Sequence, residues 1–295
     1  MTRTQKHGLR ARLAVGASAA AVAATIWGVT TLVPVDDHPT APPENAARQT
    51  PTDGKTDGKT DGKTDGKTPA DGKPGGDGKS AAPAPGPQLP DSIAHASESG
   101  GNAVNITIDD GPDPRWTPQV LEVLAKHGVK ATFCMIGPQA KAHPDLVKRV
   151  VAAGHRLCDH TMNHDTAMDK KPVAYQQAQI LDAKKLIEEA AGGGAKVEYY
   201  RAPGGAFTPD SRRIAAANGM RPLGWNVDTK DFVKPGAAAI VDAVKREIGN
   251  GPTILFHDGG GDRKQTVTAL DQVLAWLKDQ GRPTGFPVRT APDPS

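Results

Sequence analysis

The stretch that decides the fold class is AVNITIDD (residues 103–110), a short apolar run that ends in two adjacent carboxylates. A helical pattern follows, beginning at Thr117-Pro118 and ending at Gly128. Proline favours the first turn of a helix and glycine the position just past its last turn. The same order of strand and then helix recurs along the rest of the chain. Repeated units of this kind predict a parallel sheet, either closed as a barrel or open.

Five further short apolar runs are predicted as strands. They span residues 129–136, 155–159, 197–200, 221–226 and 253–257. Between them, proline and glycine again mark helix boundaries. Three helices are predicted after the first: from Pro144 to Gly154, from Pro172 to Gly192 and from Pro209 to Gly219. Two more are predicted at 237–248 and 266–280.

Polar side chains gather where the predicted strands end. These clusters are Asp109-Asp110, residues 160–164, residues 201–205, residues 228–231 and His257-Asp258. In parallel α/β architectures the carboxyl ends of the strands carry the active site. Five polar clusters at one rim therefore predict a single functional site. Asp258 either orients a group of that site or caps a turn.

The residue types at this rim indicate a metal centre. His160 and His164 are four residues apart, which on a helical turn places two imidazoles on one face, within reach of one ion. An adjacent carboxylate would complete three ligands and leave an open fourth position, as in catalytic zinc sites. Asp109 and Asp110 are neighbours at a strand end, so one can bind the ion while the other faces the substrate.

Five motifs in this order resemble those of the polysaccharide deacetylases, carbohydrate esterase family four. They are TIDDGP at 107–112, HTMNH at 160–164, RAPGG at 201–205, DTKD at 228–231 and LFH at 255–257. The resemblance covers about Ala103 to His257. It implies a single catalytic domain over residues 98–295, with an α/β fold that is a distorted parallel (β/α) barrel of about seven strands.

The resemblance also implies the role of each motif residue. Asp110, His160 and His164 resemble the ligands of a divalent metal, which in this family is usually Zn²⁺. Asp109 resembles the general base and His257 the general acid.

Around this acid–base pair the resemblance implies five supporting residues. Arg201 resembles the residue that positions the base, and Asp231 the residue that holds Arg201. Leu255 resembles the floor of an acetyl pocket, and Trp225 is its expected wall. A backbone N–H near Gly204 is the expected donor to the oxyanion.

Two positions depart from the family pattern. The family usually has an aromatic residue where Gly204 stands, so a side chain that would contact the sugar is missing here. It usually has tryptophan where Phe232 follows Asp231, which changes the groove that receives the glycan. Neither departure touches the metal ligands or the acid–base pair.

The start of the chain carries a signal for export. After a basic start, no charged residue occurs from Leu13 to Val35, and charge is what the bilayer core rejects. Ala21-Val22-Ala23 offers a cleavage pattern, but the apolar run continues past it and can span a bilayer. Residues 1–35 are therefore expected to be a signal peptide or, as their length favours, an uncleaved membrane anchor. Either one places the rest of the chain on the extracellular side, secreted or membrane-anchored.

Residues 36–97 are predicted to be a disordered linker. The tetrapeptide TDGK occurs four times in residues 52–67, and a repeat without an apolar position has nothing to bury. A calcium-binding repeat would need a ligand spacing that this one lacks. As a flexible coil the linker would reach roughly 45 Å, so it would hold the catalytic domain near the membrane.

Composition limits the function class. Of 295 residues only 37% are hydrophobic, while glycine and proline number 33 and 26, as expected for a folded part diluted by a tail. This excludes a collagen-like, coiled-coil or multi-span membrane protein. The net charge of +3 argues against nucleic acid as a partner. We expect a monomer whose partners are an acetylated glycan and, through the N-terminal segment, a membrane.

The two cysteines, Cys134 and Cys158, fall on the second and third predicted strands, which are neighbours in this topology. Cysteine pairs outside the cell are rarely left reduced, so a disulfide is the favoured prediction. Two buried, unpaired thiols are the alternative, because adjacent strands meet the geometry of a bridge only at some registers.

Several functions remain open at this point. The first is metal-dependent hydrolysis of N-acetyl groups from polysaccharide that contains N-acetylglucosamine, with release of acetate. The same fold also suits an O-acetyl esterase acting on acetylated xylan, or a catalytically inactive glycan-binding relative. A two-carboxylate glycosidase is disfavoured because Asp109 and Asp110 are adjacent instead of lying across a glycosidic bond. The tether favours a substrate next to the membrane, hence peptidoglycan, because an enzyme secreted to act on xylan would gain nothing from tethering.

Overall fold

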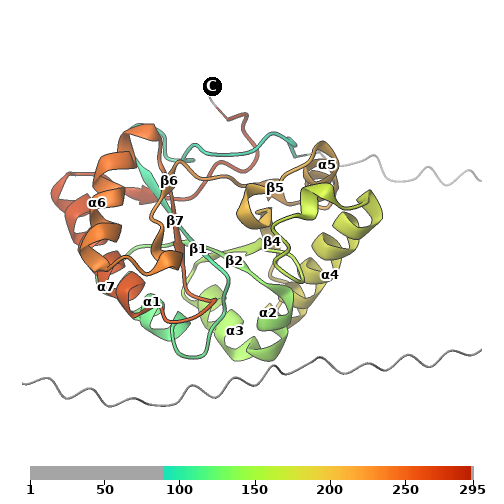
Figure 1. Ribbon diagram of the computed structural model, residues 1–295, viewed down its shortest axis with the longest axis horizontal. Helices are drawn as coiled ribbons and strands as arrows, with labels where there is room; N and C mark the ends of the chain where they lie inside the picture. Colours follow the sequence, from blue (N-terminus) through green and yellow to red (C-terminus); the bar gives the residue numbers. More distant parts are fainter. Residues whose placement is uncertain (1–88, 294–295) are drawn as a thin grey trace, which may run out of the picture. The chain divides into compact units, whose positions relative to one another are not determined.

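The computed structural model describes residues 89–293 of the chain. In this part the strands form one parallel sheet in the order β5-β4-β3-β2-β1-β7-β6, with β8 beside β1. The strands are β1 (Val104–Asp109), β2 (Thr132–Met135), β3 (Arg156–Asp159), β4 (Val197–Tyr200), β5 (Arg221–Pro222), β6 (Val227–Asp228), β7 (Thr253–His257) and β8 (Thr284–Gly285). Helices lie outside the curled sheet (Figure 1). The fold is a distorted parallel (β/α) barrel, which confirms the predicted fold class.

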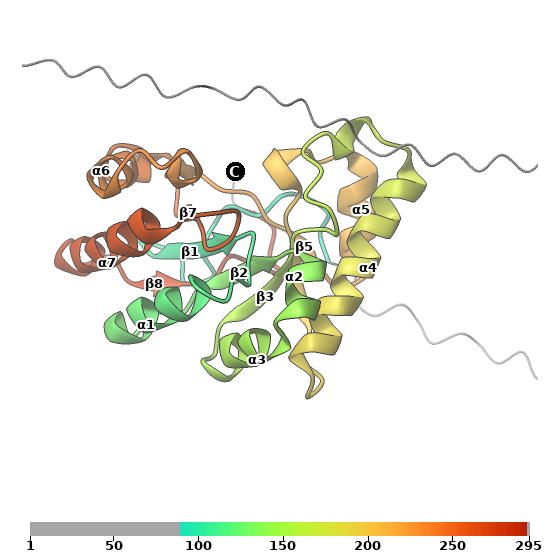
Figure 2. The same ribbon diagram turned by 60° about the horizontal axis from the view of Figure 1, so that its bottom comes forward.

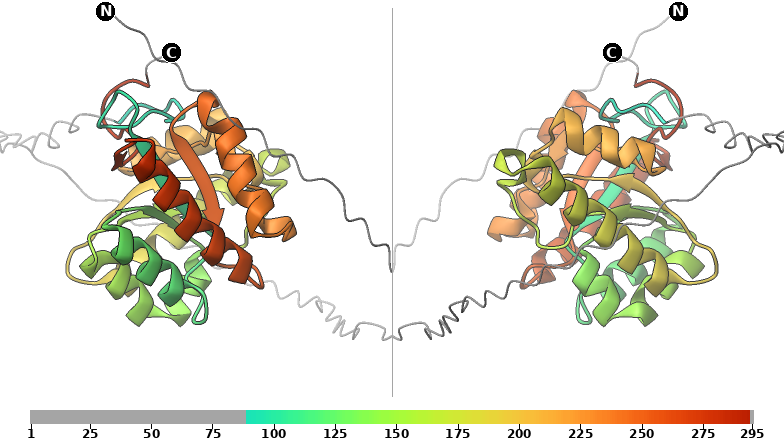
Figure 3. Two further views of the ribbon diagram at one scale, coloured as in Figure 1. Left: turned by 90° about the vertical axis from the view of Figure 1, so that its left-hand side faces the viewer. Right: turned by 90° about the vertical axis from the view of Figure 1, so that its right-hand side faces the viewer.

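The helices return the chain from the end of one strand to the start of the next. They are α1 (Thr117–His127), α2 (Gly137–Ala142), α3 (Pro144–Ala152), α4 (Val173–Ala191), α5 (Pro209–Ala217), α6 (Ala237–Glu247) and α7 (Lys264–Asp279), with short 3₁₀ turns η1 (Met168–Lys170), η2 (Pro203–Gly205), η3 (Asp231–Val233) and η4 (Ile248–Asn250). Figures 2 and 3 show the helices around the outside of the sheet. All six predicted helices are present within a few residues, whereas α2 and β8 were not predicted.

Helix α1 shows how local sequence sets these elements. Pro118 stands in its first turn, where a missing N–H leaves no carbonyl unpaired, and Gly128 follows its last turn with φ 66°, a conformation that glycine adopts without steric cost. Val120, Leu121 and Leu124 are buried on one face of the helix. Burial of each such side chain stabilises the fold by about 1.5–3 kcal/mol.

One extended segment, residues 221–228, closes the barrel. At its start β5 pairs with β4, and at its end β6 pairs with β7, although β5 and β6 are the two edges of the sheet. The connection between them, residues 223–226, spans at most about 17 Å, so the two edges must lie near each other. Of the strand predicted at 221–226, only the two residues of β5 are therefore present, and β6 follows at 227–228 on the opposite edge of the sheet.

Residues 92–95 pack against this closing segment, although the sequence predicted a linker up to residue 97. The N–H of Ala94 donates to the carbonyl of Pro222 (2.8 Å), and the N–H of Gly224 donates to the carbonyl of Ala94 (2.9 Å). The folded part therefore begins before residue 98. The predicted signal or anchor and the linker up to residue 88 lie outside the described residues. Within residues 89–293 no helix is both long and apolar enough to cross a bilayer.

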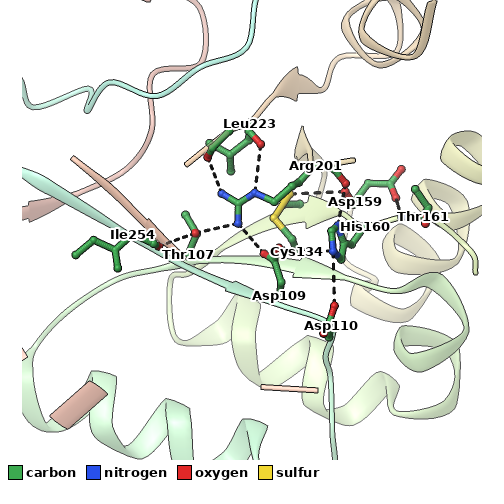
Figure 4. Close-up of a disulfide and its surroundings, with 12 residues drawn as sticks. Thr107, Asp109, Asp110, Cys134, Asp159, His160, Thr161, Arg201, Leu223 and Ile254 are labelled. Atoms are coloured by element: carbon green, nitrogen blue, oxygen red, sulfur yellow. Dashed lines mark hydrogen bonds and ion pairs between the residues drawn. A yellow bond between two sulfur atoms is a disulfide. The ribbon is translucent and has the colours of Figure 1, made fainter. Parts of the chain in front are cut away.

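A disulfide joins Cys134 of β2 to Cys158 of β3. The two residues are direct partners in the parallel register, with Cα atoms 4.1 Å apart. Figure 4 shows the bridge beside the polar side chains at the strand ends. It ties β3, which leads directly to His160, to its neighbour β2.

Candidate active site and metal centre

The five polar clusters lie together at the carboxyl ends of the strands. Asp109 ends β1 and is paired in register with His257, which ends β7. His160 directly follows β3, and Arg201 directly follows β4. They border a cleft of about 500 Å³, a volume typical of ligand sites. The cleft is lined by Asp109, Asp110, His160, His164, Thr166, Ala202, Gly204, Trp225, Asp228, Lys230, Phe232, Leu255 and His257.

Three side chains at this cleft form a candidate metal centre. One ligand atom from each of Asp110, His160 and His164 lies within 4.8 Å of the others. Oδ1 of Asp110 is 3.3 Å from Nε2 of His164 and 3.6 Å from Nε2 of His160. Ligand atoms of a tetrahedral zinc site are separated by about 3.3 Å. This Oδ1 is also buried without a hydrogen-bond partner among the described residues, as expected of an atom that binds a cation.

The imidazole of His160 is arranged to bind through Nε2. Its Nδ1 lies 2.8 Å from the carbonyl oxygen of Arg201, so Nδ1 carries the hydrogen and the lone pair of Nε2 faces Asp110. Burial lowers the pKa of His160 to about 3, which keeps the ring neutral, the form that binds metals. Two imidazoles and one carboxylate therefore fit a divalent cation and match the donor set of catalytic zinc sites.

The segment that carries both histidines is an irregular loop, so the predicted helical turn is wrong. Thr161 (φ 70°) and His164 (φ 50°) adopt left-handed backbone conformations, which are rare for a β-branched residue such as threonine. Oδ1 of Asp159 accepts a hydrogen bond from the N–H of Thr161 (2.7 Å), and Oγ1 of Thr161 accepts one from the N–H of His164 (3.3 Å). Side-chain to backbone bonds thus bring the two imidazoles together.

Asp109 and Arg201 form a buried ion pair (Figure 4). Nη1 of Arg201 donates to Oδ1 of Asp109 at 2.7 Å and to Oγ1 of Thr107 at 2.9 Å. Burial raises the pKa of Asp109, and the charge of Arg201 opposes that rise. Oδ2 of Asp109 lies 3.6 Å from Nε2 of His160. The arrangement places a carboxylate of raised basicity beside the candidate metal centre.

His257 is held by Asp231, which corrects the expectation that Asp231 holds Arg201. Nδ1 of His257 lies 2.6 Å from Oδ1 of Asp231. Oδ2 of Asp231 accepts hydrogen bonds from the N–H of His257 and from the hydroxyl of Thr266, both at 2.9 Å. Burial lowers the pKa of His257, but the hydrogen bond and charge of Asp231 more than offset this and raise it to about 9. His257 is therefore positively charged at neutral pH.

Comparison with known proteins shows the family. Residues 96–223 match the polysaccharide deacetylase family. A chitooligosaccharide deacetylase of Sinorhizobium fredii is 39% identical over 208 residues, which cover 66% of this chain and 93% of that protein. The chain belongs to the polysaccharide deacetylase family. A peptidoglycan-N-acetylglucosamine deacetylase of Bacillus cereus is 39% identical over 180 residues, 60% of this chain and 83% of that protein.

Solved structures share the fold of this polysaccharide deacetylase. A peptidoglycan N-acetylglucosamine deacetylase matches with a TM-score of 0.61 and 30% identity, covering 66% of this chain and 90% of that one. A family 4 carbohydrate esterase from Streptomyces lividans, in complex with acetate, matches with a TM-score of 0.58 and 30% identity, covering 65% and 98%. A family 4 pseudoenzyme from Bacillus anthracis matches with a TM-score of 0.61 and 28% identity, covering 67% and 68%.

The three predicted substrate-binding residues all line the cleft of the deacetylase. Leu255 lies on β7, and Trp225 lies between β5 and β6. Gly204 has φ 59°, and a Cβ at this position would lie 3.3 Å from the side chain of Thr166. A larger residue here would strain the backbone and press on Thr166. The glycine therefore leaves open the wall where the family usually has an aromatic side chain.

Phe232 stands at the rim of the cleft and is 45% exposed. Its ring packs edge-on against His257 at a centroid distance of 5.6 Å. Nζ of Lys230 lies 5.8 Å from the same ring and 2.6 Å from Oδ2 of Asp228. The phenyl group thus keeps an aromatic surface where the family usually has tryptophan.

Sequence reasoning missed three residues that hold the site together. Thr107 binds Arg201, Thr266 binds Asp231, and Asp159 shapes the histidine loop. Thr107 begins the first motif and Asp159 directly precedes the second, but both occupy ordinary strand positions, so only their proximity to the site residues marks them. Thr266 lies in the first turn of α7, and nothing in its local sequence signals contact with the site.

Proposed function

We propose that this chain is a metal-dependent de-N-acetylase of polysaccharide that contains N-acetylglucosamine, and that it releases acetate. The observation that carries the proposal is the position of a base and an acid beside one three-ligand centre. Asp109 belongs to a strand that is paired in register with the strand of His257, and both side chains line the same cleft as the ligands. A glycan-binding module would have no need for this pair.

The reaction begins with the acetyl group against Leu255 and Trp225. A divalent cation, most simply Zn²⁺, bound by Asp110, His160 and His164 would polarise the acetyl carbonyl and lower the pKa of a water molecule. Asp109 takes a proton from the attacking water, and a bond forms between the water oxygen and the carbonyl carbon. Arg201 keeps the carboxylate of Asp109 oriented through its bond to Oδ1 (2.7 Å).

The acid completes the reaction. As the bond between the carbonyl carbon and nitrogen breaks, Nε2 of His257 donates a proton to the departing nitrogen. Asp231, bound to Nδ1 at 2.6 Å, stabilises the charged imidazolium until that transfer. The products are acetate and a free amino sugar.

The substrate we propose is peptidoglycan or a chitin-like oligomer. Relatives of both kinds resemble the chain at 39% identity. The predicted export segment and spacer favour peptidoglycan, because they would hold the domain on the extracellular side close to the membrane. The exposed ring of Phe232 offers a face on which a neighbouring sugar can stack. We propose that the domain acts as a monomer.

Two other functions fit parts of the same geometry. An O-acetyl esterase would use the same base and ligands, but its leaving alcohol depends less on protonation by His257. An inactive relative is the second candidate, since a pseudoenzyme of this family shares the fold. The intact pairs Asp109–Arg201 and His257–Asp231 favour an active enzyme.

Acetate release tests the proposal. The full-length chain is incubated with peptidoglycan, chitooligosaccharides or acetylated xylan, with and without a chelator, followed by added Zn²⁺. We expect release from an N-acetylated glycan that the chelator abolishes and zinc restores. Release from xylan alone would indicate the esterase, and release from none of the three would indicate the inactive relative. Release that resists the chelator would exclude the metal.

A further inference from the structure

Arg263 is a buried cation that the proposed reaction does not use. Its side chain is 2% exposed, and within residues 89–293 no carboxylate forms an ion pair with it. Instead, Nε donates to the carbonyl of Gly259 (2.6 Å), Nη2 to the carbonyl of Gly260 (3.3 Å) and Nη1 to the carbonyl of Asp231 (3.4 Å). Burying a charge without a counter-charge is costly. The guanidinium therefore acts by fixing the backbone carbonyls that it binds.

The backbone held by Arg263 lies directly against Asp110. A Cβ added at Gly259 would collide with the carbonyl oxygen of Asp110, and one added at Gly260 would lie 3.2 Å from its Oδ2. Only glycine allows this approach. Oδ1 of Asp110 faces the two imidazoles, whereas Oδ2 lies beside Gly260.

The same loop is fixed to β1 at its start. The N–H of Asp258 donates to the carbonyl of Asp109 at 3.0 Å, and Oδ2 of Asp258 accepts from the hydroxyl of Thr117 at 2.6 Å. The loop is therefore anchored at one end by β1 and at the other by Arg263. Between these anchors it passes over the carboxylate that completes the ligand set.

We propose that Arg263 is a positioning residue for the metal centre. By fixing the carbonyls of Gly259 and Gly260, it holds the glycine loop against Asp110, and the loop keeps Oδ1 turned toward His160 and His164. The inference rests on the proposed metal site and extends it to a residue that touches neither the ion nor the glycan. Residues that orient metal ligands typically contribute about 10–100-fold to metal affinity.

Zinc titration calorimetry on chelator-stripped, full-length protein tests the inference. We expect Arg263→Met to weaken zinc binding by about 10–100-fold, because the side chain keeps its apolar length but loses every donor. Arg263→Lys keeps the charge but only one nitrogen, so its affinity should fall between those of Arg263→Met and the natural chain. This second variant carries the comparison if the methionine variant does not fold.

Arg221 supplies a matched control. It is fully buried and also binds backbone carbonyls, those of Ser92 (2.9 Å) and Ala291 (2.8 Å), but it begins β5, whereas the site lies where strands end. Arg221→Met should lower the melting temperature of the metal-free protein and leave zinc affinity unchanged.

Three results would overturn the inference. Equal zinc affinity in Arg263→Met and the natural chain would show that the loop holds Asp110 without Arg263. An equal loss in Arg221→Met would show that affinity follows general stability. If the natural chain bound no zinc, the metal part of the proposed function would fail and this inference with it, which separates that outcome from the other two.

Discussion

Asp109 and Asp110 are adjacent in sequence but their carboxylates have different partners. Oδ1 of Asp109 binds Arg201, whereas Oδ1 of Asp110 has no hydrogen-bond donor among the described residues and faces two imidazoles. The left-handed backbone of Asp110 (φ 77°) turns the second side chain away from the first. The proposed division between base and ligand follows from this geometry.

The division makes a first prediction. Asp109→Asn and His257→Ala should each lower acetate release by about 10²–10⁴-fold, the usual contribution of a positioned acid or base. Zinc stoichiometry, measured on the purified protein by elemental analysis, should stay near one. The matched variant Asp110→Asn should lose both activity and zinc. Loss of zinc in Asp109→Asn and His257→Ala would contradict the assigned roles.

A second prediction concerns pH. Because Asp231 raises the pKa of His257 to about 9, the acid is protonated below that pH, and kcat/KM should fall as the pH rises through about 9. Asp231→Asn removes the negative charge that offsets the effect of burial on the pKa of His257, so the alkaline limb of the pH profile should move to lower pH by about one unit or more. The raised pKa of His257 also contributes stability, which is fully present below about pH 6.5 and is lost as the pH rises through about 9. A uniform loss of rate in Asp231→Asn, without a shift of the limb, would mean that Asp231 is only structural.

At the residue scale, the sequence predicted which side chains meet but not always how they pair. The motif order placed Asp231 in the site, yet its partner is His257 and not Arg201. That choice depends on the pairing of β6 with β7, a long-range register that the local sequence does not encode. The conformation of Thr161 likewise depends on the hydrogen bond that its N–H donates to Asp159, which the spacing of the histidines does not reveal.

Among the elements, β5 and β6 show that a local sequence pattern does not predict which strands pair. Residues 221–226 have the composition of one strand, but only β5, at 221–222, lies within them and pairs with β4. Strand β6 follows at 227–228 and pairs with β7 at the other edge of the sheet. Helix α2 was not predicted because it begins two residues after β2, without the polar turn that usually separates elements. The long helices, marked by proline and glycine, were predicted well.

A third prediction concerns β2 and β3. Their disulfide closes a loop of 24 residues, for which loss of unfolded-state entropy contributes about 3 kcal/mol. Replacing Cys134 and Cys158 together with alanine should therefore lower the free energy of unfolding in urea by about that amount. Thiol labelling of the denatured natural chain without reductant is the control, and two reactive thiols would contradict the bridge.

On the scale of the whole molecule, the N-terminal edge of the domain belongs to the barrel. Ala94 forms backbone hydrogen bonds with Pro222 and Gly224 of the closing segment, and Ser92 accepts hydrogen bonds from Arg221 through its carbonyl and hydroxyl. The sequence predicted a linker here because residues 36–97 are poor in apolar side chains overall. The contacts that order residues 92–97 are mostly made by their backbone, which composition does not reveal.

The last prediction concerns residues 92–97 at the N-terminal edge of the domain. A chain that begins at residue 89 should melt at the same temperature as the full-length protein, whereas one that begins at residue 98 should be less stable by about 3–5 kcal/mol. The loss arises because the buried guanidinium of Arg221 would keep its bond to the carbonyl of Ala291 but lose both acceptors of Ser92, and each hydrogen bond to a charged group contributes about 1.5–3 kcal/mol. Circular dichroism melts of the two truncated chains measure the difference. Adding Arg221→Met to the shorter chain should recover part of the loss, because it removes the two donors that Ser92 no longer satisfies. Equal melting temperatures for chains that begin at 89 and 98 would place residues 92–97 outside the folding unit.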